Sequence, residues 1–145
     1  PYLILDNEMI TTLTRAAKSG IEVIIIMPHI PDKWYAFVVA KTYYRELIRA
    51  GVQIYEYKPG FVHAKVFVSD DDTATVGTIN LDYMSLYLHF ECGVFIYNNS
   101  VVDRVERDFQ ETLMKCHKVS LVELRGRSLF SKIAGQVLRL FAPLM

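Results

Sequence analysis

The chain has 145 residues, enough for one domain with a buried core. Its hydrophobic share of 52%, with nine Tyr and eight Phe, excludes a disordered or low-complexity protein. Lysine plus arginine and aspartate plus glutamate number 16 each, and the resulting zero net charge argues against a dedicated nucleic-acid binder.

The first half of the chain alternates short apolar strands with amphipathic helices. Asp6 is a suitable N-cap for a helix that ends at Gly20, and a second helix runs from near Trp34 to Gly51. Strands are predicted at residues 3–5, 21–27 and 52–57. The order strand, helix, strand, helix, strand implies parallel strands joined by right-handed crossovers.

The second half begins with a predicted hairpin. Its strands cover residues 61–69 and 73–76, and Asp70, Asp71 and Asp72 form the turn between them. A short helix or irregular turn at 81–88, a strand at 90–97 and a helix with a capping-box pattern from Ser100 to Asp103 follow. Together these elements predict an α/β fold with a mixed, mostly parallel central sheet, helices on both faces and the 61–69 strand near the centre.

The last residues differ in kind from the rest. We expect one domain over residues 1–120 and an amphipathic helical tail over residues 121–145. Between Ser128 and Phe141 the apolar residues recur at helical spacing, and Arg125 and Arg127 precede them. The apolar face of this helix either packs on the domain or contacts a membrane surface, and the flanking basic residues favour the membrane.

A set of polar residues suited to phosphate chemistry begins with His63 and Lys65 in His63-Ala64-Lys65. Asp70 comes after four further residues, and Thr78 and Asn80 lie in Gly77-Thr78-Ile79-Asn80. On a strand, His63 and Lys65 project from the same face. A neutral histidine can attack phosphorus and a lysine can neutralise a phosphate oxygen, while Thr78 and Asn80 can donate further hydrogen bonds. The alternative is a solvated histidine–lysine pair on an edge strand.

Two carboxylates lie close to this pattern in the sequence. Glu91 begins a later strand, where it can bind one imidazole nitrogen of His63 and fix its tautomer, or else lie on the surface. Asp70 is at the hairpin turn, and we expect it to hold the turn rather than to face His63. Of the other histidines, His29 is expected in a solvated loop and His117 beside helix-terminal carbonyls.

His63, Lys65, Asp70, Gly77, Thr78 and Asn80 together resemble the HKD motif of the phospholipase D superfamily. The wider sequence is similar to the carboxy-terminal catalytic half of bacterial cardiolipin synthases over essentially the whole chain. The sequence segments that carry this similarity are the opening Pro1-Tyr2, Pro59-Gly60-Phe61-x-His63-Ala64-Lys65, Asn80-Leu81-Asp82-Tyr83-x-Ser85, Phe90-Glu91 and the closing Leu140-x-x-Pro143-Leu144.

The resemblance implies transfer of a phosphatidyl group between two phosphatidylglycerol molecules, giving cardiolipin and glycerol through a phosphohistidine, with no metal or other cofactor. It gives His63 the role of nucleophile or acid, and it makes Lys65, Thr78 and Asn80 phosphate ligands and Glu91 the histidine partner, with Asp70 the third residue of the motif. Two such motifs form one site in the family, so the second must come from an amino-terminal portion outside this chain or from a second copy.

Two positions depart from the family pattern. Thr78 stands where the family usually has Ser, which keeps the hydroxyl, and Met84 stands where it usually has Arg. The competing hypotheses are a phospholipase D-like phosphodiesterase or nuclease active as a homodimer, and a half that only scaffolds. The intact His63, Lys65 and Glu91 argue against the scaffold.

The setting of the chain is also an expectation. Its start, without a methionine or a signal peptide, indicates a piece of a longer protein. Cys92 and Cys116 match no metal-site spacing and make a poor disulfide framework, which favours a reducing compartment. With the resemblance, this predicts a catalytic domain on the cytoplasmic side of a bacterial inner membrane.

Overall fold

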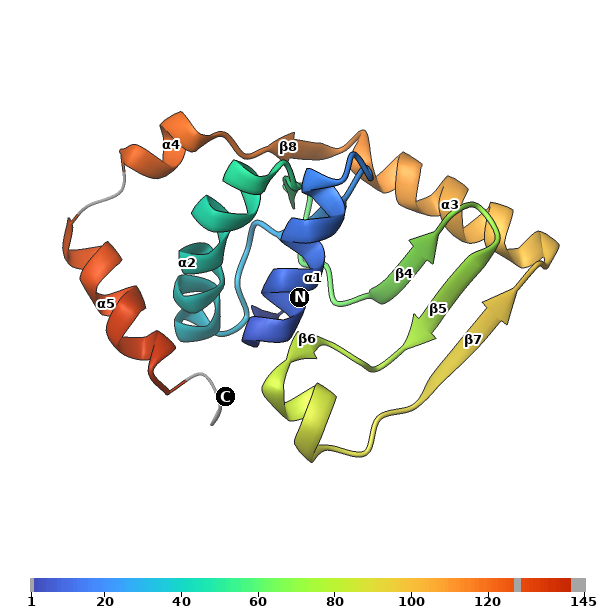
Figure 1. Ribbon diagram of the computed structural model, residues 1–145, viewed down its shortest axis with the longest axis horizontal. Helices are drawn as coiled ribbons and strands as arrows, with labels where there is room; N and C mark the ends of the chain where they lie inside the picture. The colour runs from blue at the N-terminus through green and yellow to red at the C-terminus, as the bar shows by residue number, and fades with distance from the viewer. Residues whose placement is uncertain (1, 127–128, 142–145) are drawn as a thin grey trace.

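The computed structural model describes residues 2–126 and 129–141 (Figure 1). Helices and strands alternate in the first half, and antiparallel strands dominate the second. The elements are β1 (Leu3–Ile4), α1 (Asn7–Lys18), β2 (Ile24–Pro28), α2 (Trp34–Ala50), β3 (Gln53–Tyr57), β4 (Lys65–Ser69), β5 (Thr73–Gly77), β6 (Leu81–Asp82), the π-helix η1 (Met84–Leu88), β7 (Gly93–Tyr97), α3 (Ser100–Leu113), β8 (Cys116–Lys118), α4 (Leu121–Arg125) and α5 (Leu129–Arg139).

The predicted α/β class and the carboxy-terminal helix are confirmed, but the strands are arranged differently from the single sheet that we expected. Among the described residues they form three sheets, with orders β1-β6, β2-β3-β8 and β4-β5-β7. The parallel pairs are β1 with β6 and β2 with β3; the others are antiparallel. The prediction of a mostly parallel sheet with the 61–69 strand near its centre was wrong: besides the predicted hairpin, β7 and β8 pair antiparallel with β5 and β3, and β4 lies at the edge of its sheet.

Helix α2 is the centre of the hydrophobic core. Val39, Tyr43, Tyr44 and Leu47 recur at helical spacing and are almost completely buried. They pack in one cluster with Leu3, Leu5, Val52 and Ile54. In Figure 1, α2 lies between α1 and α5, and it contacts both.

Local signals explain where several helices begin and end. The Asp6 carboxylate accepts a hydrogen bond from the Met9 N–H at 2.7 Å, and Gly51 ends α2 with a left-handed φ of 105°. Helix α3 is capped by Asn99, not by the Ser100 pattern, because the Asn99 side chain accepts from the Val101 N–H. A capping box forms instead at Ser120, the N-cap of α4.

The tail helix α5 packs on α2 with one face and exposes another. A Cβ atom on Gly135 would lie 2.8 Å from Thr42 Cγ2, so the two helices approach closely there. On the outer face, Ile133, Val137 and Leu140 are 55%, 51% and 79% exposed. None of the described helices is both long and apolar enough to cross a membrane.

Several residues of the sequence patterns lie outside the description. They are Pro1, Arg127, Ser128, Pro143 and Leu144, and the side chains of Leu129, Phe130, Ser131 and Lys132.

Helix α3 covers part of one face of the β4-β5-β7 sheet, and no part of the opposite face. Helix α3 contacts all three strands, and the burial of Ala74 identifies the face that it covers. Phe67 and Phe95 both pair with Thr75, so they share the opposite face. On that face Phe67, Phe95 and Tyr97 are 41%, 69% and 65% exposed, and we refer to these three residues as the aromatic row.

Candidate active site

The register of the β4-β5-β7 sheet brings several predicted site residues to one end of it. Lys65 pairs with Gly77, and Gly77 pairs with Gly93, so these residues form one row across the three strands. His63 precedes this row by two residues, Thr78 follows it by one, and Glu91 precedes it by two. The close approach requires glycine, because a Cβ atom on Gly77 would overlap the Cys92 carbonyl oxygen and lie 2.6 Å from Gly93 Cα.

His63 lies just before β4, in the irregular segment 61–64, and not on a strand as predicted. Its backbone carbonyl accepts a hydrogen bond from Lys65 Nζ at 2.8 Å. Its ring contacts those of Phe61 and Tyr2, with centroid distances of 5.5 and 6.5 Å. The lysine is therefore folded back toward the histidine, and two aromatic rings hold the imidazole.

The surroundings of His63 favour its neutral form. Burial and the charge of Lys65 hold the pKa of His63 below its usual range. Burial also lowers the pKa of Lys65, while the negative charge of Glu91 acts in the opposite direction. A neutral imidazole beside a cationic amine is the pairing that attack on a phosphate ester requires.

Glu91 is held by Thr78. The Thr78 hydroxyl donates a hydrogen bond to the Glu91 carboxylate, and the Cys92 N–H donates to the same hydroxyl oxygen at 3.0 Å. The bond from Thr78, followed by one from Ser85, lowers the pKa of Glu91. No hydrogen bond joins Glu91 to His63 among the described residues, so the predicted histidine-orienting role of Glu91 stays a prediction.

Asn80 belongs to a corner that joins β6 to η1. Its Nδ2 donates to the Ser85 hydroxyl at 3.3 Å, and the Ser85 N–H donates to Asp82 Oδ1 at 2.7 Å. Asn80 Oδ1 is buried and has no hydrogen-bond partner, which leaves it as an acceptor directed into this corner. Met84, the position at which the family usually has Arg, begins η1.

Asp70 lies at the other end of the hairpin. Ser69 pairs with Thr73 at the far end of the register, about 13 Å along β4 from Lys65 at 3.3 Å per residue. Asp70 follows with a left-handed φ of 54° and accepts a hydrogen bond from the Ser69 hydroxyl at 3.0 Å. This position agrees with a role in the turn.

Three residues near His63 were missed by the motif analysis. The Tyr2 hydroxyl donates to Asp32 Oδ2 at 2.5 Å, and Lys33 Nζ lies 5.6 Å from the centroid of the Tyr2 ring. The available signal was topological, because Asp32 follows β2 and the His63 segment follows β3, and parallel neighbouring strands bring such loops to one edge.

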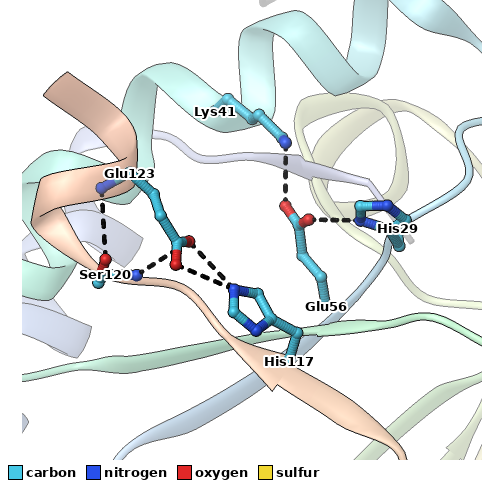
Figure 2. Close-up of polar contacts among 6 residues, drawn as sticks. All are labelled: His29, Lys41, Glu56, His117, Ser120 and Glu123. Atoms are coloured by element: carbon cyan, nitrogen blue, oxygen red, sulfur yellow. Dashed lines mark hydrogen bonds and ion pairs between the residues drawn. The ribbon is translucent and has the colours of Figure 1, made fainter. Parts of the chain in front are cut away.

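A second polar cluster crosses the β2-β3-β8 sheet (Figure 2). The buried Glu56 carboxylate receives His29 Nδ1 at 2.9 Å and Lys41 Nζ at 3.1 Å. His117, opposite Glu56 in the register, points instead to Glu123 at 3.1 Å. His29 lies in an exposed bend, as expected, and its Nδ1 also contacts the buried Glu56 carboxylate. The expectation for His117 was wrong, because His117 binds the side chain of Glu123 and not helix carbonyls.

Groups of three or more His, Cys, Asp and Glu side chains arranged to hold a metal ion do not occur among the described residues.

Comparison with known proteins places the chain in a family. The sequence model described as "Cardiolipin synthase, PLD-like domain" matches residues 1–113. A cardiolipin synthase from Clostridium perfringens is 41% identical over the whole chain and 30% of its own length, and cardiolipin synthase 2 of Bacillus anthracis is 37% identical over the whole chain and 28% of its length. An uncharacterized protein from Streptococcus mutans is 51% identical over the whole chain and 32% of its length.

A crystal structure of Nuc, a phospholipase D family member from Salmonella typhimurium, superposes with a TM-score of 0.68 at 19% identity, covering 81% of this chain and 77% of that one, which establishes a shared fold. The chain spans about a third of the length of the curated relatives that it matches. It belongs to the family of cardiolipin synthase PLD-like domains.

Proposed function

We propose that this chain supplies one half of a phosphatidyltransferase site that converts two phosphatidylglycerol molecules to cardiolipin and glycerol. The observation that carries the proposal is the hydrogen bond from the Lys65 amine to the His63 backbone carbonyl, at the sheet end that also holds Thr78 and Glu91. The lowered pKa of His63 supports its role as a neutral nucleophile. The names of the Clostridium and Bacillus relatives support the lipid substrate.

The proposed reaction has two displacements at phosphorus. A ring nitrogen of His63 attacks the phosphodiester, the bond from phosphorus to the glycerol oxygen breaks, and an acid in the opposing half protonates the departing glycerol. The hydroxyl of a second phosphatidylglycerol then attacks the phosphohistidine, loses its proton to the same group and releases His63. Lys65 neutralises the phosphoryl oxygens in both steps. The reverse assignment, with His63 as acid, uses the same residues.

The aromatic row gives the opposing half a surface to bind. It lies on the face of the β4-β5-β7 sheet that also carries Lys65, and it is not covered by α3. Burial of Phe67, Phe95 and Tyr97 would therefore bring a second motif toward His63. The second half is either another part of a longer protein or a second copy of the chain.

The test is cardiolipin formation from phosphatidylglycerol by the protein that carries this domain. We expect His63→Ala to lower the rate by at least about 1000-fold, because covalent catalysis is lost. The matched control is His117→Ala, which removes a histidine distant from the site. We also expect an acid-labile phosphohistidine in the wild type under rapid quench. Full activity in His63→Ala would refute the proposal, and cleavage of DNA in place of lipid would favour the nuclease.

We further propose that the exposed face of α5 contacts the membrane that holds the substrate, on the cytoplasmic side of a bacterial inner membrane. Ile133, Val137 and Leu140 form the outward apolar stripe that interfacial helices present. A chain that ends near Arg127 should bind anionic liposomes more weakly than the whole chain in a sedimentation assay. Equal binding by the two chains would contradict this proposal.

A further inference from the structure

A basic groove runs between helices α1, α2 and α5, away from the candidate active site. Its volume is about 480 Å³. We define the basic groove by the residues that line it: Thr14, Lys18, Thr42, Arg45, Glu46, Arg49, Ala50, Gln136 and Arg139. On α2, Arg45 and Arg49 lie 11 and 15 residues after Trp34, which corresponds to about 16 and 22 Å along the helix from the end nearest Tyr2 and His63. The basic groove is therefore separate from the phosphate site at His63.

The cations that line the basic groove outnumber its carboxylates. Lys18, Arg45 and Arg49 form no ion pair with a carboxylate among the described residues, although Glu46 lies on the same wall. Arg139 stacks on the Tyr43 ring at 4.1 Å, which fixes its guanidinium. In a chain whose net charge is zero, four cations against one carboxylate is a local concentration of positive charge.

The neutral side chains of the basic groove leave the cations as its main donors. The Thr14 hydroxyl donates to the Ile10 carbonyl at 2.8 Å, and the Thr42 hydroxyl donates to the Val39 carbonyl at 2.7 Å. Both hydroxyl protons are thus used within the helices. A ligand would be held by guanidinium and ammonium groups, whose geometry and charge suit phosphate oxygens. Cations in the last turns of α1 and α2 also stabilise those helix ends, but Arg45 lies before the last turn of α2.

The outer stripe of α5 borders the basic groove. Successive helical residues are rotated by about 100°, so Gln136 lies about 40° from Leu140 around the axis of α5, on the side toward Arg139. The same helix thus presents an apolar stripe (Ile133, Val137 and Leu140) and, next to it, two residues of the basic groove. In Figure 1, α5 and α2 lie at one end of the molecule and the β4-β5-β7 sheet at the other.

We propose that the basic groove binds the phosphate of an anionic phospholipid headgroup while the adjacent stripe of α5 enters the membrane surface. A free phosphate would satisfy the cations equally well, but it gives no reason for the apolar stripe beside them. The inference rests on the proposed membrane contact of α5 and not on phosphatidyl transfer. It assigns a second lipid site that holds the domain on the membrane and takes no part in the reaction at His63.

The test is sedimentation with vesicles of phosphatidylglycerol mixed with phosphatidylcholine, and with phosphatidylcholine alone. We expect Arg45→Gln/Arg49→Gln to weaken binding to the anionic vesicles about 30-fold, from about 1 kcal/mol per basic residue at an anionic surface. The matched control is Arg104→Gln/Arg107→Gln on α3, which removes the same charge from two exposed arginines and should change binding less than about threefold.

Further variants separate the explanations. Arg45→Lys/Arg49→Lys should retain most of the binding, since it keeps the charge, and circular dichroism verifies that each variant is folded. In a His63→Ala background, Arg45→Gln/Arg49→Gln should weaken binding by the same factor as in the wild type, which separates this site from the catalytic proposal. Equal losses in the α2 and α3 variants would overturn the inference in favour of net charge alone. Tight binding of soluble glycerol phosphate at the basic groove, without vesicle binding, would overturn the lipid source.

Discussion

At the scale of single residues, the state of His63 is set by what lies beside it. Desolvation and the charge of Lys65 both lower the pKa of His63, which favours the neutral form of its ring. We expect Lys65→Met to raise the titration midpoint of His63, because a neutral side chain no longer opposes imidazolium formation. NMR titration of the ring protons measures this directly.

The acid limb of activity should follow the same shift. With His63 as the nucleophile, activity falls as the pH drops through the pKa of His63, and that fall should lie below the pH at which a free histidine titrates. The control is His117→Ala, whose acid limb of activity should match that of the wild type, because His117 faces Glu123 on another sheet. An unchanged His63 midpoint in Lys65→Met would contradict the electrostatic account.

Tyr2 also contacts the His63 ring. Its edge contact with His63 should depend on the aromatic ring, and the hydroxyl serves Asp32. We expect Tyr2→Ala to lower kcat for phosphatidyl transfer about fivefold to tenfold, from roughly 1 kcal/mol for an aromatic pair. Tyr2→Phe keeps the ring and should stay within about twofold of the wild type. A larger loss of kcat in Tyr2→Phe would show that the Tyr2 hydroxyl, and not its ring, supports catalysis.

The buried carboxylate of Glu56 affects the stability of the fold. It is buried and contacts Lys41 Nζ and His29 Nδ1, so loss of the lysine leaves a poorly compensated carboxylate inside the protein. We expect Lys41→Met to lower the free energy of unfolding by about 3 kcal/mol in urea denaturation followed by circular dichroism. Lys41→Met/Glu56→Gln should recover much of that loss. If the double variant is as unstable as the single one, packing of the lysine stem accounts for the effect.

At the scale of elements, the site depends on how closely β7 approaches β5. Gly77 faces the Cys92 carbonyl with no space for a side chain, whereas a Cβ atom on Gly93 would meet its neighbours at an ordinary 3.6 Å. We expect Gly77→Ala to lower the free energy of unfolding by about 1–3 kcal/mol and to displace Glu91 from Thr78. Gly93→Ala is the matched control and should cost clearly less. Equal costs for the two would show that backbone entropy, not overlap, dominates.

The sequence was informative where a single residue determines the local structure. Asp6 and Gly51 are in contact with the backbone groups that they cap, so the ends of α1 and α2 follow from residue type. Strands β6 and β8 have two and three residues, too few for a periodic pattern, and they exist because β1 and β3 offer pairing partners that are distant in the sequence. The hairpin turn was predictable from its three aspartates, but the arrangement of the three sheets depended on such tertiary pairing.

The candidate site was likewise predictable where it depends on local spacing, and not where it depends on tertiary contacts. The hairpin register brings Lys65 and Thr78 to one end because the turn length sets the pairing, and His63 and Glu91 follow from their spacing. Tyr2 and Asp32 could not be found that way, because their contact spans 30 positions and depends on the packing of two different loops.

At the scale of the whole molecule, the aromatic row is an exposed apolar surface that a second domain or copy can cover. We expect the 145-residue chain to self-associate at micromolar concentration in sedimentation velocity, because burial of a large aromatic side chain contributes about 1.5–3 kcal/mol. Phe95→Ser/Tyr97→Ser should weaken that association roughly 100-fold.

The control for this association is Val101→Ser/Met114→Ser, which removes two exposed apolar side chains from α3 and its end and should leave the association intact. A wild-type chain that sediments as a monomer would contradict self-association through the aromatic row and would leave another part of a longer protein as the opposing half.

Trp34, at the start of α2, has a practical consequence for every measurement on this protein. It is the one tryptophan of the sequence, 66% exposed, and it follows the Asp32–Lys33 pair that contacts Tyr2. Because its indole already faces water in the folded state, its emission should change little on unfolding. A substrate or second half that covers this edge should instead shift the emission to shorter wavelength and protect it from iodide quenching. Tryptophan fluorescence should therefore report on occupation of the site and be insensitive to unfolding of the core.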